Sequence, residues 1–141
     1  MNSRRGLVFS LQEPLPTGLL SLLSDFRLLV NQCLREALAT GATARGSLSR
    51  FASAQAHEAR LNVDFGLQAA KIALSLAKSH RRRVRRGIAS KVPYVRTAFA
   101  RAPSRCFHFN IDSGKMRLSL RYGEWTSFHV VPSLFHHECI E

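Results

Sequence analysis

Acidic side chains are missing from the middle of this 141-residue chain. No Asp or Glu lies between Phe65 and Ile111, whereas this interval contains 11 of the 21 Lys and Arg residues. Cations held a few Å apart repel one another, and mobile counterions screen this repulsion only in part. A solvated protein surface normally intersperses both signs of charge. The missing carboxylates, together with a net charge of +12, therefore argue against an ordinary mixed surface and favour a polyanionic partner.

Cysteine and long apolar runs are also scarce. Three scattered cysteines do not make a disulfide framework, so we expect a reducing, cytoplasmic setting, and the positive charge favours association with the nucleoid. No run of about 18 apolar residues is present, so no transmembrane helix and no membrane partner are predicted. The Arg4-Arg5 pair resembles a twin-arginine export signal, but the apolar run after it is interrupted too early, and no export is predicted.

The sequence lacks the motifs of several enzyme classes. It contains no P-loop, no dinucleotide fingerprint and no nucleophile elbow, and its nine carboxylates form no recognisable catalytic pair. A small zinc-dependent enzyme is kept as an alternative, although the ligand spacing departs from the usual zinc knuckle and no metal or cofactor is predicted. If Phe107 and Phe109 face the core, Cys106 and His108 share the outer face of a strand. The candidate zinc ligands are Cys106, His108, His136, His137 and Cys139.

Apolar residues at helical spacing predict three helices. The first is expected to start at Thr17 as its N-cap and to stop at Gly41. A weaker second helix is predicted over residues 47–60, and a third is expected to begin at Asp64 as its cap and to end at Gly87. The side of the second helix expected to pack comprises Phe51, Ala54, Glu58 and Leu61.

Alternating apolar residues predict strands over residues 7–11, 94–99, 107–111, 116–122 and 125–131. The first strand needs a partner, and the C-terminal strands are the available sheet, so the helices are interpreted as an insertion into a small β-domain. The predicted fold is therefore α+β, an antiparallel β-domain with a three-helix insertion. Its expected parts are residues 1–16 (first strand), 17–90 (helical insert) and 91–141 (remaining strands).

The basic stretch begins on the third predicted helix and continues into a predicted strand. Cations in the last turn of a helix suit its macrodipole, but this explains only two or three of them. Arginine offers a planar fork that matches phosphate oxygens, and Tyr94 adds a surface on which bases can stack. The predicted nucleic-acid-binding residues are Lys71, Lys78, Arg81, Arg82, Arg83, Arg85, Arg86, Lys91, Tyr94 and Arg96.

Three segments resemble the N-terminal part of the transposon-encoded TnpB (OrfB) family. They are LSDFRLLVNQCL at residues 23–34, SKVPYVR at residues 90–96 and FNIDSGKMRLSL at residues 109–120. Members of this family are RNA-guided DNA nucleases related to the type V CRISPR effectors. The resemblance implies an OB-like β-barrel, called the wedge, with a helical recognition insert. It also implies that the Arg81 to Arg96 segment contacts the backbones of a guide RNA and of target DNA.

In that family a nuclease half follows this region, with three RuvC-type carboxylates and a four-cysteine zinc ribbon. The present sequence contains no counterpart of these motifs. The resemblance therefore implies a binding module that does not cut DNA by itself and whose missing partner is a C-terminal nuclease domain. The alternative is a stand-alone basic protein of transcription or ribosome assembly, which binds RNA or DNA through an OB-like barrel without any link to transposons.

Overall fold

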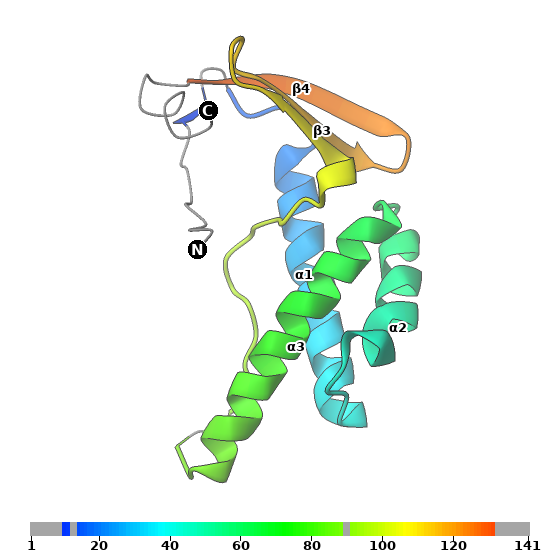
Figure 1. Ribbon diagram of the computed structural model, residues 1–141, viewed down its shortest axis with the longest axis vertical. Helices are drawn as coiled ribbons and strands as arrows, with labels where there is room; N and C mark the ends of the chain where they lie inside the picture. Colours follow the sequence, from blue (N-terminus) through cyan, green and yellow to red (C-terminus); the bar gives the residue numbers. More distant parts are fainter. Residues whose placement is uncertain (1–9, 12–13, 89–90, 132–141) are drawn as a thin grey trace, which may run out of the picture.

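Three helices pack side by side, and an antiparallel sheet lies across one end of them (Figure 1). The computed structural model describes residues 10–11, 14–88 and 91–131. The helices are α1 (Leu19–Thr40), α2 (Arg45–Glu58) and α3 (Val63–Arg85). The predicted α+β class is confirmed. None of these described helices combines the length and the apolar character that crossing a membrane requires.

The sheet joins the two ends of the described chain. Its strands are β1 (Ser10–Leu11), β2 (Phe107–Asn110), β3 (Lys115–Arg121) and β4 (Glu124–Val131), arranged in the order β1-β4-β3-β2 with every pair antiparallel. Leu11 pairs with Val130 although the three helices separate them in sequence. The predicted pairing of the first strand with the C-terminal sheet is therefore confirmed for Ser10–Leu11, while residues 7–9 lie outside the described chain. The three-part division at residues 16 and 90 stays a prediction.

Residues 91–103, which we call the strap, contain no strand, so the prediction for residues 94–99 is wrong. The backbone of Val95 bonds a side chain instead of a neighbouring strand. Its N–H donates to Asn31 Oδ1 at 2.7 Å, and its carbonyl accepts from Asn31 Nδ2 at 3.0 Å. Phe99 meets Phe26 of α1 edge to face, with 5.3 Å between ring centres. The alternating apolar residues of the strap therefore pack on the helices, and not in the sheet.

Both predicted helix ends at glycine are confirmed, but both predicted caps are wrong. Gly41 and Gly87 follow α1 and α3 with φ of 71° and 70°. The residue before α1 is Gly18, not Thr17, because the chain enters the helix at φ 88°, which favours glycine. Asn62, not Asp64, caps α3, since its Oδ1 accepts the N–H of Asp64 at 3.0 Å. Asp64 lies in the first turn, where the helix dipole favours its charge.

The second helix packs only in part through the predicted side, where Leu61 is buried and Phe51 lies partly buried against the core. Ala54 and Glu58 are exposed, whereas Ala52 and Ala56 are fully buried. These small side chains allow α2 to approach α3 closely at Gly66. A Cβ atom at Gly66 would lie only 2.7 Å from the carbonyl oxygen of Ala52. The prediction missed Ala52 and Ala56 because close helix packing here uses small side chains, which give a weak apolar signal in the sequence.

Replacing Gly66 with alanine is expected to destabilise the fold by about 1 to 3 kcal/mol, as overpacking does. The clash is with backbone, which cannot rotate away, and it outweighs the gain of about 1 kcal/mol in helix propensity. Gly46, in the first turn of α2, has open space around its Cα and is a matched control. Urea unfolding followed by circular dichroism should show a lower midpoint for Gly66→Ala only. Equal midpoints for the two variants would contradict the close approach.

Candidate nucleic-acid interface

The last turns of α3 carry most of the predicted site residues and extend past the ends of α1 and α2 (Figure 1). Arginine and lysine are good helix formers, so the helix continues after its apolar half ends. The cations of the last turn also meet the negative end of the helix dipole. The N–H of Gly87 bonds the carbonyl of Val84 at 2.9 Å and closes the helix. The basic segment is thus mounted on a regular helix that is anchored in the core.

Four cations of α3 share one side of the helix. Lys71, Lys78, Arg82 and Arg85 follow one another at intervals of seven, four and three residues, which places them in a row. All four are exposed, and we call them the basic face. Within the described part of the chain, the salt bridge found joins Arg121 to Asp25, far from this row in sequence. No described carboxylate pairs with the basic face, so its charge is not neutralised within the described part of the chain.

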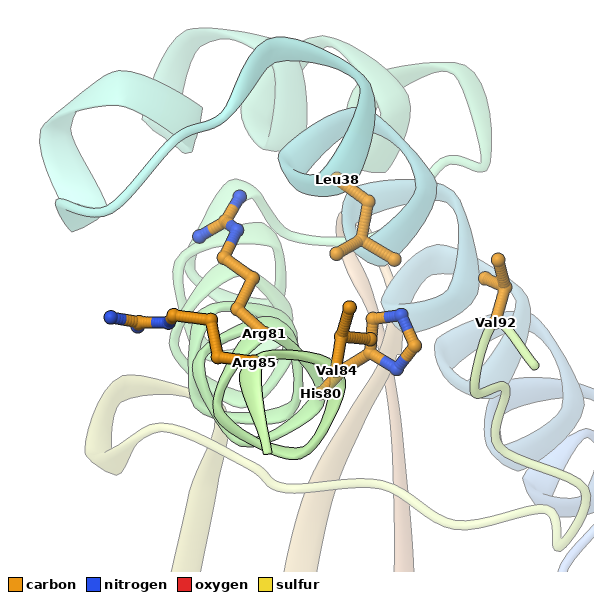
Figure 2. A pocket seen from close by; sticks show the side chains of 6 residues that line it. All are labelled: Leu38, His80, Arg81, Val84, Arg85 and Val92. Carbon is orange, nitrogen blue, oxygen red and sulfur yellow. The ribbon is translucent and has the colours of Figure 1, made fainter. Parts of the chain in front are cut away.

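Arg81 has a different role. Its guanidinium donates to the carbonyl of Ala37 at 2.6 Å and to that of Ala42 at 2.8 Å. These carbonyls belong to the last turn of α1 and the loop after it, and the Ala37 carbonyl also accepts the backbone N–H groups of Gly41 and Ala42. Figure 2 shows Arg81 turned toward this connection, whereas Arg85 points outward. Arg81 therefore fastens α3 to α1, and we leave it out of the interface.

A second group of cations lies beside the strap. Arg83 projects from a different side of α3 from the basic face, and it lines a pocket of about 490 Å³ together with Lys91 and Arg96. The guanidinium carbon of Arg96 lies 5.2 Å from the centre of the Tyr94 ring, over its face. Arg86, the C-cap residue of α3, is exposed. We call the pocket that Arg83, Lys91 and Arg96 line the Tyr94 pocket. Its lining residues are Arg83, Ile88, Lys91, Val92, Pro93, Tyr94 and Arg96.

The continuous basic run of the sequence is thus divided into two surfaces. Between the two surfaces, His80 and Val84 lie on the side of α3 that faces Leu38 and Val92 in Figure 2, and these side chains line a second hollow of about 470 Å³. The prediction of the site listed cations and one aromatic residue, and it missed the apolar residues that line the pockets. The sequence signal that could have revealed these apolar residues was the presence of Ile88 and Val92 within the basic stretch.

The proposed shared face of Cys106 and His108 is wrong. Cys106 is fully buried in the core, in a 3-10 helix (Ser104–Cys106) before β2. His108 is exposed and stacks on Trp125, with ring centres 5.7 Å apart. The turn of 3-10 helix rotates the chain and breaks the alternation that the prediction assumed. The other three candidate ligands, His136, His137 and Cys139, lie outside the described residues.

Both described cysteines are poor nucleophiles. Burial, with a smaller contribution from Glu36, raises the pKa of the Cys33 thiol to about 11. Burial, with a smaller contribution from Asp64, raises the pKa of the Cys106 thiol to about 11 as well. Since the thiolate is the reactive species, both thiols stay protonated and inert near neutral pH.

We therefore expect the two buried thiols to react with iodoacetamide only when the protein unfolds. A Cys139→Ser variant leaves Cys33 and Cys106 as the cysteines that can be labelled. Mass spectrometry should detect almost no alkylation in native buffer at pH 7 and two alkyl groups in urea. Rapid labelling of either thiol in native buffer would show that it is more accessible, or more acidic, than the structure indicates.

The basic face offers positive charge, and the Tyr94 pocket offers positive charge and an aromatic ring; both are suited to binding and neither to catalysis. Among residues 10–11, 14–88 and 91–131, no three His, Cys, Asp or Glu side chains gather as metal ligands would. Comparisons with protein-family models, with curated proteins and with solved structures find no match to this chain. The candidate interface therefore rests on the residues and contacts described above.

Proposed function

We propose that this chain is a nucleic-acid-binding module. The observation that carries the proposal is a set of exposed cations that no described carboxylate neutralises, mounted on one anchored helix and the strap beside it. Such a surface relieves its self-repulsion when a phosphate backbone replaces small counterions. The proposed interface comprises the basic face (Lys71, Lys78, Arg82 and Arg85), Arg86, and Arg83, Lys91, Tyr94 and Arg96 of the Tyr94 pocket.

A phosphate chain fits this surface better than a membrane does. A helix that lies on a membrane inserts its apolar face between the lipids. The apolar face of α3 is already used, because Ala69, Ala73 and Ala77 are fully buried against the rest of the core. The exposed side of the same helix is cationic and contains arginine, whose guanidinium binds two phosphate oxygens at once.

We further propose that the module is the wedge and recognition region of a TnpB-like RNA-guided nuclease, with an OB-like sheet. Its partners are then a guide-type RNA and target DNA, and the chain contributes binding and not cleavage. The three resembling segments support this, and two of them touch, because Asn31 of the first bonds the backbone of Val95 in the second. The pairing of β1 with β4 around the helices also agrees with a helical insert in a β-domain.

The neighbouring coding DNA tests this family assignment. An adjacent reading frame that encodes RuvC-type carboxylates and paired CxxC motifs is expected if the module belongs to a TnpB-like nuclease. A neighbourhood without such motifs would favour the stand-alone basic protein, while nucleic-acid binding itself would stand unaffected.

The salt dependence of binding tests the general proposal. Fluorescence anisotropy with a labelled, structured RNA is measured over a series of KCl concentrations. The logarithm of the affinity is expected to fall linearly with the logarithm of salt concentration, by about 0.7 to 0.9 for each phosphate contact. If all eight cations of the interface make such contacts, the slope is about −6 to −7. An affinity that does not change with salt, or no binding at low salt, would overturn the proposal.

A further inference from the structure

The Tyr94 pocket has an apolar lining that phosphate binding does not explain. Ile88, Val92 and Tyr94 are 63%, 58% and 60% exposed, and all three line the pocket whose other members include Arg83, Lys91 and Arg96. The basic face on the other side of α3 needs no such residues to meet a phosphate chain. An apolar floor surrounded by cations therefore indicates a ligand that carries both a flat apolar part and negative charge.

The strap holds this floor in place. Asn31 bonds both the N–H and the carbonyl of Val95, as a neighbouring strand would, and fixes the backbone there. Tyr94 and Arg96 are both exposed, and the guanidinium of Arg96 lies over the Tyr94 ring. The aromatic ring is thus positioned before any ligand arrives, which reduces the entropy cost of binding.

We propose that the Tyr94 pocket binds an unpaired nucleotide, with its base against Tyr94 and its phosphates on the surrounding cations. This inference rests on the proposed nucleic-acid-binding function and specifies its ligand. The pocket volume of about 490 Å³ is in the range of small-ligand sites. Bases of a duplex stack on their neighbours and cannot enter the pocket, whereas bases of single strands, loops and bulges can. The pocket therefore selects unpaired segments, while the basic face accepts paired and unpaired backbones alike.

Charge favours a nucleic acid over a peptide as the occupant. An acidic peptide with apolar side chains also combines the two properties, but it has no reason to meet cations on more than one side of α3. A phosphate chain that leaves the pocket continues past Arg86 toward the basic face, with which no described carboxylate forms a salt bridge.

Three probes separate base stacking from charge. They are a short single-stranded RNA, the same RNA annealed to its complement, and inorganic polyphosphate of similar length, which has charge but no bases. The variant Tyr94→Ala is expected to lower affinity for single-stranded RNA by about 5- to 100-fold, the usual effect of losing one stacking side chain. Its affinity for the duplex and for polyphosphate should match that of the wild type.

Two further variants serve as controls. Tyr94→Phe keeps the ring and should bind single-stranded RNA as the wild type does. Tyr122→Ala removes the other tyrosine of the chain, which is 80% exposed at the turn between β3 and β4, and should leave all affinities unchanged. Circular dichroism verifies that each variant is folded before its affinities are compared.

The possible outcomes distinguish this inference from the function on which it rests. If wild-type protein binds all three probes and Tyr94→Ala binds them equally well, the unpaired-nucleotide site is overturned and nucleic-acid binding stands. A loss of equal size on all three probes also overturns stacking, since polyphosphate has nothing to stack. If the wild type binds none of the probes, both proposals fail. Tyr94-dependent binding of an acidic apolar peptide, with single-stranded RNA unaffected by Tyr94→Ala, would assign the pocket to a protein partner.

Discussion

Replacing Lys78, Arg82 and Arg85 together with glutamine is expected to flatten the salt dependence of RNA binding by about 2 to 3 units of log-log slope. Each of these side chains is exposed on the basic face, and each lost phosphate contact removes about 0.7 to 0.9 from the slope. The substitutions keep the helix, because glutamine forms helices about as well as lysine and arginine do. Anisotropy titrations over the same series of KCl concentrations measure the change.

The control removes the same charge from elsewhere on the molecule. Arg50, Arg105 and Arg117 are exposed on α2, on the 3-10 helix and on β3. Changing these three to glutamine lowers the net charge equally but is expected to alter the slope by less than one unit, as long-range charges are largely screened. Equal flattening by the two triple variants would mean that the whole protein, and not the basic face, attracts the RNA.

Two neighbouring arginines are expected to differ when each is replaced by methionine: one substitution should lower stability and the other should weaken RNA binding. Arg81→Met removes the hydrogen bonds to the carbonyls of Ala37 and Ala42 while keeping most of the aliphatic stem. Hydrogen bonds from a charged group contribute about 1.5 to 3 kcal/mol, so the free energy of unfolding should fall by about this amount. Arg82→Met removes an exposed side chain and should change stability by no more than about 0.5 kcal/mol.

Urea unfolding and RNA titration, applied to both variants, separate the two roles. Arg81→Met should unfold at lower urea concentration and, at temperatures where it stays folded, keep the salt slope of the wild type. Arg82→Met should unfold as the wild type does and lose about one unit of slope. If Arg81→Met were as stable as the wild type and also lost slope, Arg81 would belong to the interface and the fastening of α3 to α1 would be unimportant.

Local patterns predicted much of the architecture. The apolar spacing of α1 and the glycine after it, and the alternation in β3 and β4, each depend on residues close together in sequence. The pairing of β1 with the C-terminal sheet was predictable for a related reason, because a lone strand must find partners for its backbone. The failures concern contacts between distant residues. No local signal marks Asn31 as the hydrogen-bond partner of Val95, 64 positions later. Nor does any local signal show that Ala52 of α2 packs closely against Gly66 of α3.

The sequence by itself determined that this protein combines helices with an antiparallel sheet and that its middle carries basic residues without acidic ones. Both follow from composition and short-range spacing, which any fold of the chain must accommodate. Only the tertiary structure decided which of these cations is bonded within the fold and which are exposed. Arg81 finds acceptors 39 and 44 positions away, and the strap brings Tyr94 beside Arg83. Such assignments depend on where distant segments pack, because a guanidinium bonds whatever acceptor the fold places within its reach.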